Sequence, residues 1–151
     1  MKILHTTDTT NQIYQDALSI RKRVFVTEQN VSLALEIDEN ETKTVHFVGY
    51  VNGQAVTTAR LLPEKAAFHV QRVATLKIAR GHHYGQQLFT ALEDYAVAHN
   101  KPALILGGQD QALGFYEKLG FHKTERPGFL DAGIPHHEMY KQLSSGQVPK
   151  G

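Results

Sequence analysis

The sequence contains no cysteine among its 151 residues. This absence excludes disulfide bonds, a covalent acyl-cysteine intermediate and zinc sites built from thiolates. The chain also lacks an apolar run long enough to cross a bilayer. Its opening, Met1-Lys2-Ile3-Leu4, meets polar residues at once and does not read as a signal peptide. We therefore expect a cytoplasmic protein with no membrane partner.

The sequence also has no large excess of positive or negative charge. The 16 Lys and Arg residues nearly balance the 15 Asp and Glu residues, which gives a net charge of +1 with neutral histidines. This balance argues against a nucleic-acid partner. A chain of 151 residues that is 41% hydrophobic can bury a real core. We expect a single domain over residues 1–143, followed by a polar tail over residues 144–151.

Acidic residues are absent between Lys65 and Leu92, although this stretch carries several basic side chains. Residues 68–75 alternate as in a strand, and residues 88–96 repeat at helical spacing in a helix expected to end near Asn100. The loop between them reads Arg80-Gly81-His82-His83-Tyr84-Gly85. The first N–H groups of a helix have no intrahelical partner and can hold a phosphate. The pattern predicts an anion site, a device that P-loops and dinucleotide-binding proteins share.

Two blocks of the sequence resemble one protein family. The loop is similar to the Arg/Gln-x-x-Gly-x-Gly/Ala pyrophosphate loop of the GNAT superfamily of acetyltransferases, with Arg80 at its start and Gly85 at its end. Residues 114–121, Gly-Phe-Tyr-Glu-Lys-Leu-Gly-Phe, resemble the Phe-Tyr-x-x-x-Gly-Phe helix and turn of that superfamily. His83 departs from the pattern, because it stands where the family usually has its first glycine. Residues 24–29 and 133–139 are similar to a bacterial subgroup of small GNAT proteins, and the likeness covers about residues 2–143.

The resemblance implies an α/β (α+β) GNAT fold, with a mixed central sheet, antiparallel N-terminal strands, splayed parallel central strands and flanking helices. The residues agree with this fold. Asn52-Gly53 predicts a hairpin between strands at 45–51 and 54–62. The apolar run 103–106 predicts a buried strand parallel to residues 68–75, because the helix between them is a crossover connection.

Other elements follow from local signals. Residues 13–25 carry a helical stripe, preceded by Thr9 and Gln12 at capping-box spacing. Gly120 should end the helix that carries Tyr116. Residues 2–5 read as an edge strand, and residues 121–124 and 137–143 as closing strands.

The resemblance also implies where acetyl-CoA would bind. Its pantetheine arm would lie between the splayed strands and pair with the backbone of Val73, Ala74 and Thr75. Its pyrophosphate would take N–H groups from the loop. The contacts that the resemblance implies are with Val73, Ala74, Thr75, Arg80, Gly81, His82, His83, Tyr84, Gly85, Gln86, Gln109 and Tyr116.

The implied chemistry is direct attack of an amine on the thioester, without a covalent enzyme intermediate. A primary amine such as lysine, with a pKa near ~10.4, must lose a proton before it attacks. Tyr116 matches the superfamily's tyrosine close to the CoA sulfur and is the expected acid for the leaving thiolate. The base stays open, because Gln71 and its neighbours offer no carboxylate. Glu28, a carboxylate of the acidic stretch, His137 and water are candidates, and Glu28 ranks first.

The acceptor side is less specific. Phe25, Glu28 and His137 are the candidate substrate residues. The acidic stretch over residues 30–42, which contains Glu36, Asp38, Glu39 and Glu41, is either a solvated loop or short helix or a wall of the acceptor site that attracts a cationic amine. We read the basic run over residues 21–23 as a solvated face at a helix end, and His46 as a hydrogen-bonded packing residue.

The nine histidines include two adjacent pairs, but neither pair has metal-binding spacing. We therefore expect no metal. The sequence predicts an acetyl-CoA-dependent N-acetyltransferase that acts on a small-molecule or peptide amine, and exposed edge strands make a homodimer plausible. The alternative is an acyl-CoA-binding sensor or regulatory module without turnover. A dinucleotide-binding oxidoreductase lacks its glycine fingerprint.

Overall fold

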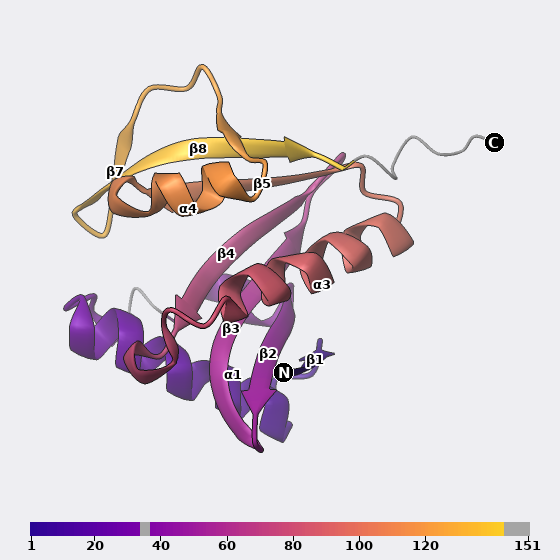
Figure 1. The fold of residues 1–151 in the computed structure, drawn as a ribbon, viewed down its shortest axis with the longest axis vertical. Helices are drawn as coiled ribbons and strands as arrows, with labels where there is room; N and C mark the ends of the chain where they lie inside the picture. Colours follow the sequence, from indigo (N-terminus) through magenta and orange to yellow (C-terminus); the bar gives the residue numbers. More distant parts are fainter. Residues whose placement is uncertain (34–36, 144–151) are drawn as a thin grey trace. The chain divides into compact units, whose positions relative to one another are not determined.

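The computed structural model describes residues 1–33 and 37–143 (Figure 1). Over these residues eight strands form one mixed sheet in the order β1-β2-β3-β4-β5-β8-β6, with β7 paired to β8. The strands are β1 (Lys2–Thr6), β2 (Val45–Val51), β3 (Gln54–Pro63), β4 (Phe68–Thr75), β5 (Ala103–Gln109), β6 (His122–Lys123), β7 (Phe129–Asp131) and β8 (Ile134–Gln142). The helical elements are α1 (Gln12–Arg21), the π-helix η1 (Lys22–Glu28), α3 (Tyr84–Ala98), α4 (Leu113–Lys118) and three 3₁₀ turns, η2 (Glu39–Thr42), η3 (Lys77–Ala79) and η4 (Asp110–Ala112). The predicted α+β architecture is confirmed.

Contacts between Cα atoms divide the chain into two compact units. The first comprises Met1–Leu62 and Gln71–Leu92, and the second comprises Pro63–Val70 and the chain from Glu93 onward. The single domain stays a prediction. The tail expected at residues 144–151 lies outside the described residues.

The first unit is built on the antiparallel strands β1, β2 and β3. β1 pairs with β2 from Lys2 opposite Tyr50 to Thr6 opposite His46. Asn52 and Gly53 connect β2 to β3 with φ angles of 51° and 79°, as a type I′ turn requires. The predicted hairpin is confirmed. A core cluster joins the helical segment to the strands and contains Ala17, Ile20, Val24, Val48, Ala74 and Leu76.

The start of α1 differs from the prediction. Its N-cap is Asn11, whose side chain accepts a hydrogen bond from Tyr14 N at 3.1 Å. Asn11 also donates through Nδ2 to Thr6 Oγ1 at 2.7 Å, which ties the cap to the end of β1. The capping box expected at Thr9 and Gln12 is therefore wrong, because the N-cap is two residues further on and accepts from Tyr14 N in place of Gln12 N.

The second unit is organised around β5. β5 pairs parallel with β4 from Phe68 opposite Leu104 to Val70 opposite Leu106, which confirms the predicted crossover. On its other side β5 pairs antiparallel with β8, from Ala103 opposite Gln142 to Gln109 opposite His136. β5 therefore lies inside the sheet, between a parallel and an antiparallel neighbour.

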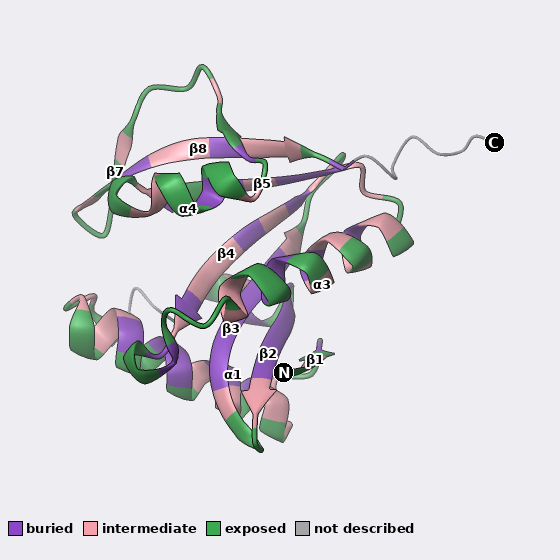
Figure 2. Ribbon diagram, in the orientation of Figure 1, coloured by how far each residue is buried: buried purple, intermediate pink, exposed green. Residues whose placement is uncertain are grey.

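The helices α3 and α4 both end as the sequence predicts. Asn100, at φ 63°, follows α3, and Lys101 N donates to Ala96 O at 2.9 Å in a Schellman-type end. Gly120, at φ 98°, closes α4 in the same left-handed conformation. On α3 the buried positions recur at helical spacing (Figure 2), at Leu88, Phe89, Leu92 and Ala96.

The C-terminal region contains one strand that the sequence did not predict. β7 pairs with β8 through a turn at Ala132 and Gly133, which have φ angles of 52° and 76°. Alanine rarely adopts positive φ, so Ala132 gives no turn signal. β8 consequently begins at Ile134, earlier than predicted, and β6 comprises only His122 and Lys123.

Candidate active site

The loop that precedes α3 presents backbone N–H groups to solvent. His83 O accepts the first intrahelical bond, from Gln87 N at 3.1 Å, so His83 is the N-cap of a 15-residue helix. The N–H groups that follow therefore lack intrahelical partners. Residues 80–83 are all exposed, and the first turn of α3 carries no acidic side chain. The positive end of the helix dipole is left open to an anion.

His83 adopts a backbone conformation that glycine prefers. Its φ is 62°, in the left-handed region, and Gly81 is also left-handed at φ 87°. His83 therefore differs from a glycine at this position in its side chain, while its φ angle is one that glycine adopts freely. An L-residue in this conformation is strained by roughly 1–2 kcal/mol. The loop keeps this backbone conformation at that cost in free energy.

Arg80 is held by two partners in the first unit. Its Nη1 and Nη2 donate to Glu28 Oε2 and Oε1 at 3.0 Å and 2.7 Å, and its Nε donates to the Thr75 carbonyl at 3.0 Å. This planar fork fixes the start of the loop against the end of β4 and the end of η1.

The contact with Arg80 argues against Glu28 as the general base. Its pKa is lowered by the hydrogen bonds from Arg80, with further contributions from the charges of Arg80, Lys77 and Arg23. A carboxylate held this way accepts a proton poorly. The geometry suits Glu28 to positioning Arg80 and does not favour the role of general base.

The end of β4 carries the three predicted backbone positions. Thr57 Oγ1 donates to the Ala74 carbonyl at 3.1 Å and lies 2.9 Å from Thr75 Oγ1. The carbonyls of Ala74 and Thr75 thus already accept one bond each within the chain. Because a carbonyl oxygen has two lone pairs, each can accept a second bond. Phe25 is half-buried and packs against the neighbouring core cluster.

Two carboxylates of the acidic stretch, Asp38 and Glu41, belong to a largely buried ion-pair network, so neither sequence interpretation of the stretch holds for them. Glu36 of the same stretch lies outside the described residues. Arg21 Nη1 and Nη2 donate to both oxygens of Glu41 at 2.9 Å and 2.8 Å. Arg60 donates through Nη1 to Glu41 at 2.7 Å and through Nη2 to Asp38 at 2.9 Å. The side chains of Arg21 and Arg60 are each only 1% exposed. These carboxylates are neutralised internally and do not attract an amine.

Two further side chains complete this network. Tyr14 Oη donates to Glu41 Oε1 at 2.9 Å, and Arg72 Nη2 donates to Asp38 Oδ2 at 3.1 Å. Arg72 lies within β4 at a φ of 56°, a conformation rare for a non-glycine residue in a strand. The network thereby links α1 and η2 to β3 and to the irregular point of β4. Arg21 was predicted to be solvated, and that prediction is wrong.

Tyr116 lies in the second unit, on α4, and is 8% exposed. Burial raises the pKa of its hydroxyl to about 12. Its ring meets Phe115 and Phe121 edge-on, with centroid separations of 5.2 Å and 6.1 Å. A Cβ added at Gly108 would lie 3.0 Å from Tyr116 Cδ2, so glycine lets this ring pack directly on β5. The hydroxyl stays protonated at neutral pH, as a proton donor must.

His137 forms an ion-pair contact that the sequence did not predict. Its Nδ1 lies 2.7 Å from Asp110 Oδ1, which joins β8 to the start of η4. The predicted contact residue Gln109 precedes Asp110 at the end of β5 and accepts from Gln111 Nε2 at 2.9 Å. The second unit therefore brings Asp110 and His137 together, and the first unit brings Glu28, Arg80 and Thr75 together.

Comparison with known proteins identifies the family. Residues 7–143 match the family described as "Acetyltransferase (GNAT) domain". This chain belongs to the GNAT acetyltransferase family. The GNAT fold and the acetyltransferase activity predicted from the sequence are thereby confirmed.

Individual relatives of this GNAT chain agree. The uncharacterized N-acetyltransferase YjcF of Bacillus subtilis (strain 168) is 38% identical over 127 residues, which cover 84% of this chain and 91% of YjcF. A crystallised protein from Lactobacillus plantarum is 32% identical, with a TM-score of 0.85 over 94% of this chain and 97% of the other. An aminoglycoside 6′-N-acetyltransferase complexed with coenzyme A has a TM-score of 0.73 at 15% identity, over 100% and 99% of the two chains. This last likeness concerns the fold alone.

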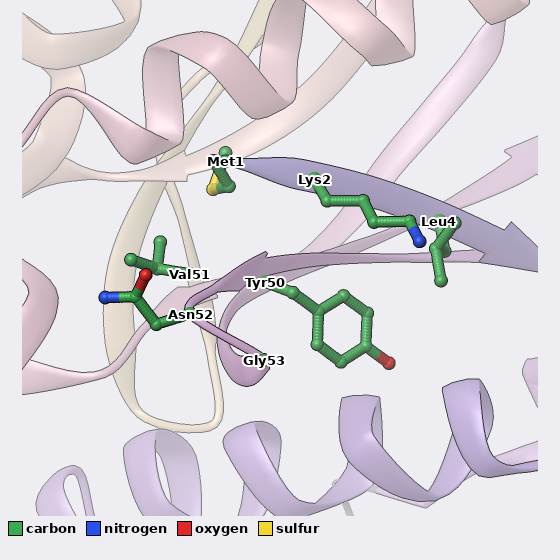
Figure 3. Close-up of a pocket in the computed structure, with 7 residues that line it drawn as sticks. All are labelled: Met1, Lys2, Leu4, Tyr50, Val51, Asn52 and Gly53. Carbon is green, nitrogen blue, oxygen red and sulfur yellow. The ribbon is translucent and has the colours of Figure 1, made fainter.

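A cavity of about 430 Å³ lies elsewhere in the first unit of the GNAT chain (Figure 3). It is lined by Met1, Lys2, Leu4, Tyr50, Val51, Asn52 and Gly53. The Tyr50 hydroxyl donates to Asp16 Oδ2 at 2.7 Å. None of the lining residues belongs to the predicted acetyl-CoA or acceptor sets.

Metal ligands and membrane spans were sought among the described residues of the GNAT chain. Residues 1–33 and 37–143 contain no cluster of three or more His, Asp or Glu side chains that could hold a metal ion. Within the same residues, no helix has the length and apolarity needed to span a membrane. His46 is buried, with its Nε2 2.9 Å from the Glu41 carbonyl, and the packing role predicted for it is confirmed.

Proposed function

We propose that this GNAT chain transfers an acetyl group from acetyl-CoA to a primary amine of a small molecule or peptide, by direct attack on the thioester. The observation that carries the proposal is the loop before α3. Its backbone is left-handed at His83, in a conformation that favours glycine. Strained backbone conformations cluster at functional sites, so the strain at this position supports an anion-binding role for the loop.

The residues present fit acetyl-CoA. The exposed N–H groups of residues 81–86 suit a pyrophosphate, and Arg80 adds a guanidinium whose charge Glu28 partly neutralises. The backbone of Val73, Ala74 and Thr75 is the proposed partner of the pantetheine arm. Acetyl-CoA would supply the acetyl thioester whose carbonyl carbon the amine attacks. The GNAT neighbour complexed with coenzyme A supports this choice of co-substrate.

Tyr116 is the proposed acid. With a pKa of about 12 its hydroxyl is fully protonated at neutral pH and can give its proton to the departing thiolate. Gln109 is kept as a proposed co-substrate contact. Phe25, Glu28 and His137 are kept as proposed residues of the acceptor side, with Glu28 acting through Arg80.

The test is thiol release from acetyl-CoA with spermidine, kanamycin and a lysine-containing peptide as acceptors. Because the chain has no cysteine, a thiol reagent reads only the released CoA. Tyr116→Phe should lower turnover by about 10²-fold, the usual worth of a general acid. Tyr140→Phe is the matched control, since the Tyr140 hydroxyl bonds Gln142 on the same strand. Acetyl-CoA binding without turnover of any acceptor would instead identify the sensor alternative.

A further inference from the structure

We infer that His137 is the general base of the proposed acetyl transfer and that Asp110 positions it. The inference rests on the proposed function. His137 Nδ1 lies 2.7 Å from Asp110 Oδ1, a short contact between an imidazole and a carboxylate. The side chains are 29% and 43% exposed, so an acceptor can reach the histidine without opening the unit.

The contact selects one tautomer of the imidazole. An ionised carboxylate can only accept, so Nδ1 carries the proton that Asp110 receives. Nε2 is then left with its lone pair. Among residues 1–33 and 37–143, no hydrogen-bond partner lies on Nε2. In other enzymes this arrangement activates nucleophiles: a carboxylate orients the imidazole through one nitrogen, and the other nitrogen takes the proton.

The surroundings of His137 leave room for the ring. Its Cα partner in the antiparallel β5–β8 ladder is Gly108, and on the other side lies Gly128. A Cβ at Gly128 would come within 2.9 Å of both Cε1 and Nε2 of His137. The ring therefore lies between two residues without side chains, where larger residues would cover its nitrogen.

The same register places the proposed acid and base on one face of the sheet. Residues directly opposite in an antiparallel pair point to the same face, about 5 Å apart at Cβ. The Cβ direction of Gly108 meets the Tyr116 ring at 3.0 Å, so His137 shares its face with Tyr116. All these residues belong to the second unit.

Few charged groups face the imidazole. Asp110 comes from the start of η4, Tyr116 comes from α4, and the segment before β7 contributes Gly128. The next residue on β8, Glu138, points to the opposite face, where it accepts from Thr124 Oγ1 at 3.0 Å and from Arg126 at 3.4 Å. Asp110 is thus the charged group that contacts His137 on this face.

Three of the other carboxylates considered for the base, Glu28, Asp38 and Glu41, are engaged elsewhere. Glu28 is bound on both oxygens by Arg80. Asp38 and Glu41 are bound by the arginines of the buried network. His137 is the candidate from the sequence that combines exposure, an oriented tautomer and an open nitrogen.

The protons balance as follows. His137 Nε2 takes one proton from the acceptor ammonium, and the freed nitrogen lone pair forms the C–N bond as the C–S bond breaks. The Tyr116 hydroxyl protonates the departing sulfur and regains a proton from the acetylated nitrogen. His137 then releases its proton to solvent. The net products are the amide, the CoA thiol and one proton, with no other reactant.

The experiment compares wild type with His137→Ala in acetylation of spermidine, kanamycin and a lysine-containing peptide across pH 6.5 to 10. Near pH 7 we expect His137→Ala to lose about 10²-fold in kcat. The deficit should shrink as the pH approaches the acceptor's own pKa of about 10.4, where the amine is neutral without help. Added imidazole should restore part of the rate, because the space between the two glycines can receive it.

Two further variants separate this role from a structural one. Asp110→Asn keeps the side-chain shape but no longer holds the tautomer, so it should lose at least about tenfold at neutral pH. His69→Ala is the matched control. His69 contacts Glu64 at 3.0 Å in the same unit, with the same exposed fractions of 29% and 43%. It should keep wild-type kcat.

The outcomes are distinguishable. A pH-dependent deficit in His137→Ala with unchanged acetyl-CoA affinity supports the inference. A wild type that turns over, with a His137→Ala deficit under twofold or independent of pH, overturns the inference and leaves the proposed function intact. A wild type that binds acetyl-CoA and acetylates none of the acceptors overturns both.

Discussion

His83 combines a side chain with a backbone conformation that glycine prefers, at φ 62°. We predict that His83→Gly keeps acetyl-CoA affinity within about threefold, because glycine adopts this conformation freely. His83→Val should weaken binding about tenfold, since a β-branched residue adopts this left-handed conformation with more strain than histidine does. Isothermal titration of the two variants measures the difference.

The neighbouring histidine provides the comparison for this prediction. His82 is not among the residues with positive φ, so Val at this position meets no comparable strain. Equal losses in His82→Val and His83→Val would contradict the explanation by backbone conformation.

Gly108 sets the position of the Tyr116 ring. A Cβ here would lie 3.0 Å from Cδ2 and 3.1 Å from Cε2 of that ring, so the ring must move by a few tenths of an ångström. We predict that Gly108→Ala lowers kcat about tenfold, because small misplacements of a catalytic group are costly. Gly114→Ala, with no atom within 4 Å of the added Cβ, should leave kcat unchanged. Steady-state kinetics with thiol detection tests both variants, and equal kcat values would refute the packing argument.

At the residue scale, local motifs single out some candidates and miss others. Arg80 and Tyr116 could be proposed because each lies in a local motif. Arg21, Arg60 and Asp110 could not, because their partners lie 20, 19 and 27 positions away in the chain. An arginine at a helix end looks solvated until the carboxylate that buries it is known. Glu28 was ranked as a base for the same reason, since its partner Arg80 is 52 positions away.

Among the elements, α1, η2, β3 and β4 are joined by one buried network of charges. Removing one partner from such a network leaves an uncompensated buried charge. We predict that Glu41→Gln lowers the free energy of unfolding by about 3–5 kcal/mol, because Arg21 loses its carboxylate and Arg60 keeps only Asp38. Glu39→Gln, at an exposed position of the same turn, should have little effect. Chemical denaturation of both variants is the measurement.

The network also predicts a pH dependence. Burial alone would raise the pKa of Glu41, but the hydrogen bonds and charge of Arg21, with Tyr14 and Arg60, lower it below its usual value. A lowered folded-state pKa gives stability that is present above the unfolded value of about 4.3 and is lost as the pH falls through the folded pKa. The stability gap between wild type and Glu41→Gln should therefore narrow below pH ~4. A gap that stays constant to pH 2 would show that Glu41 does not titrate with unfolding.

Most elements could be predicted from periodicity, and the failures have local causes. The β2–β3 hairpin and the end of α3 carry Asn and Gly at left-handed positions, which are strong signals. β7 was missed because its turn begins with Ala132, a residue with no turn preference. The π-helical stretch after α1 leaves no mark on a sequence that already reads as helical.

At the scale of the whole molecule, the family assignment and the fold agree, and the chemistry depends on a few side chains. The acidic stretch does not define the acceptor, because two of its carboxylates, Asp38 and Glu41, bind arginines of the same chain. The homodimer stays a prediction. Because the chain has no cysteine, acetyl transfer proceeds without an acyl-cysteine intermediate.

The most direct test of acetyl-CoA as co-substrate is isothermal titration of acetyl-CoA into wild type and Gly81→Pro. Gly81 has a φ of 87°, which proline at about −65° cannot adopt, so the substitution disrupts the loop before α3. We predict binding on the order of micromolar in wild type and a loss of at least about tenfold in Gly81→Pro. Absence of binding in wild type, or equal binding by both proteins, would contradict the assignment of this loop to the co-substrate.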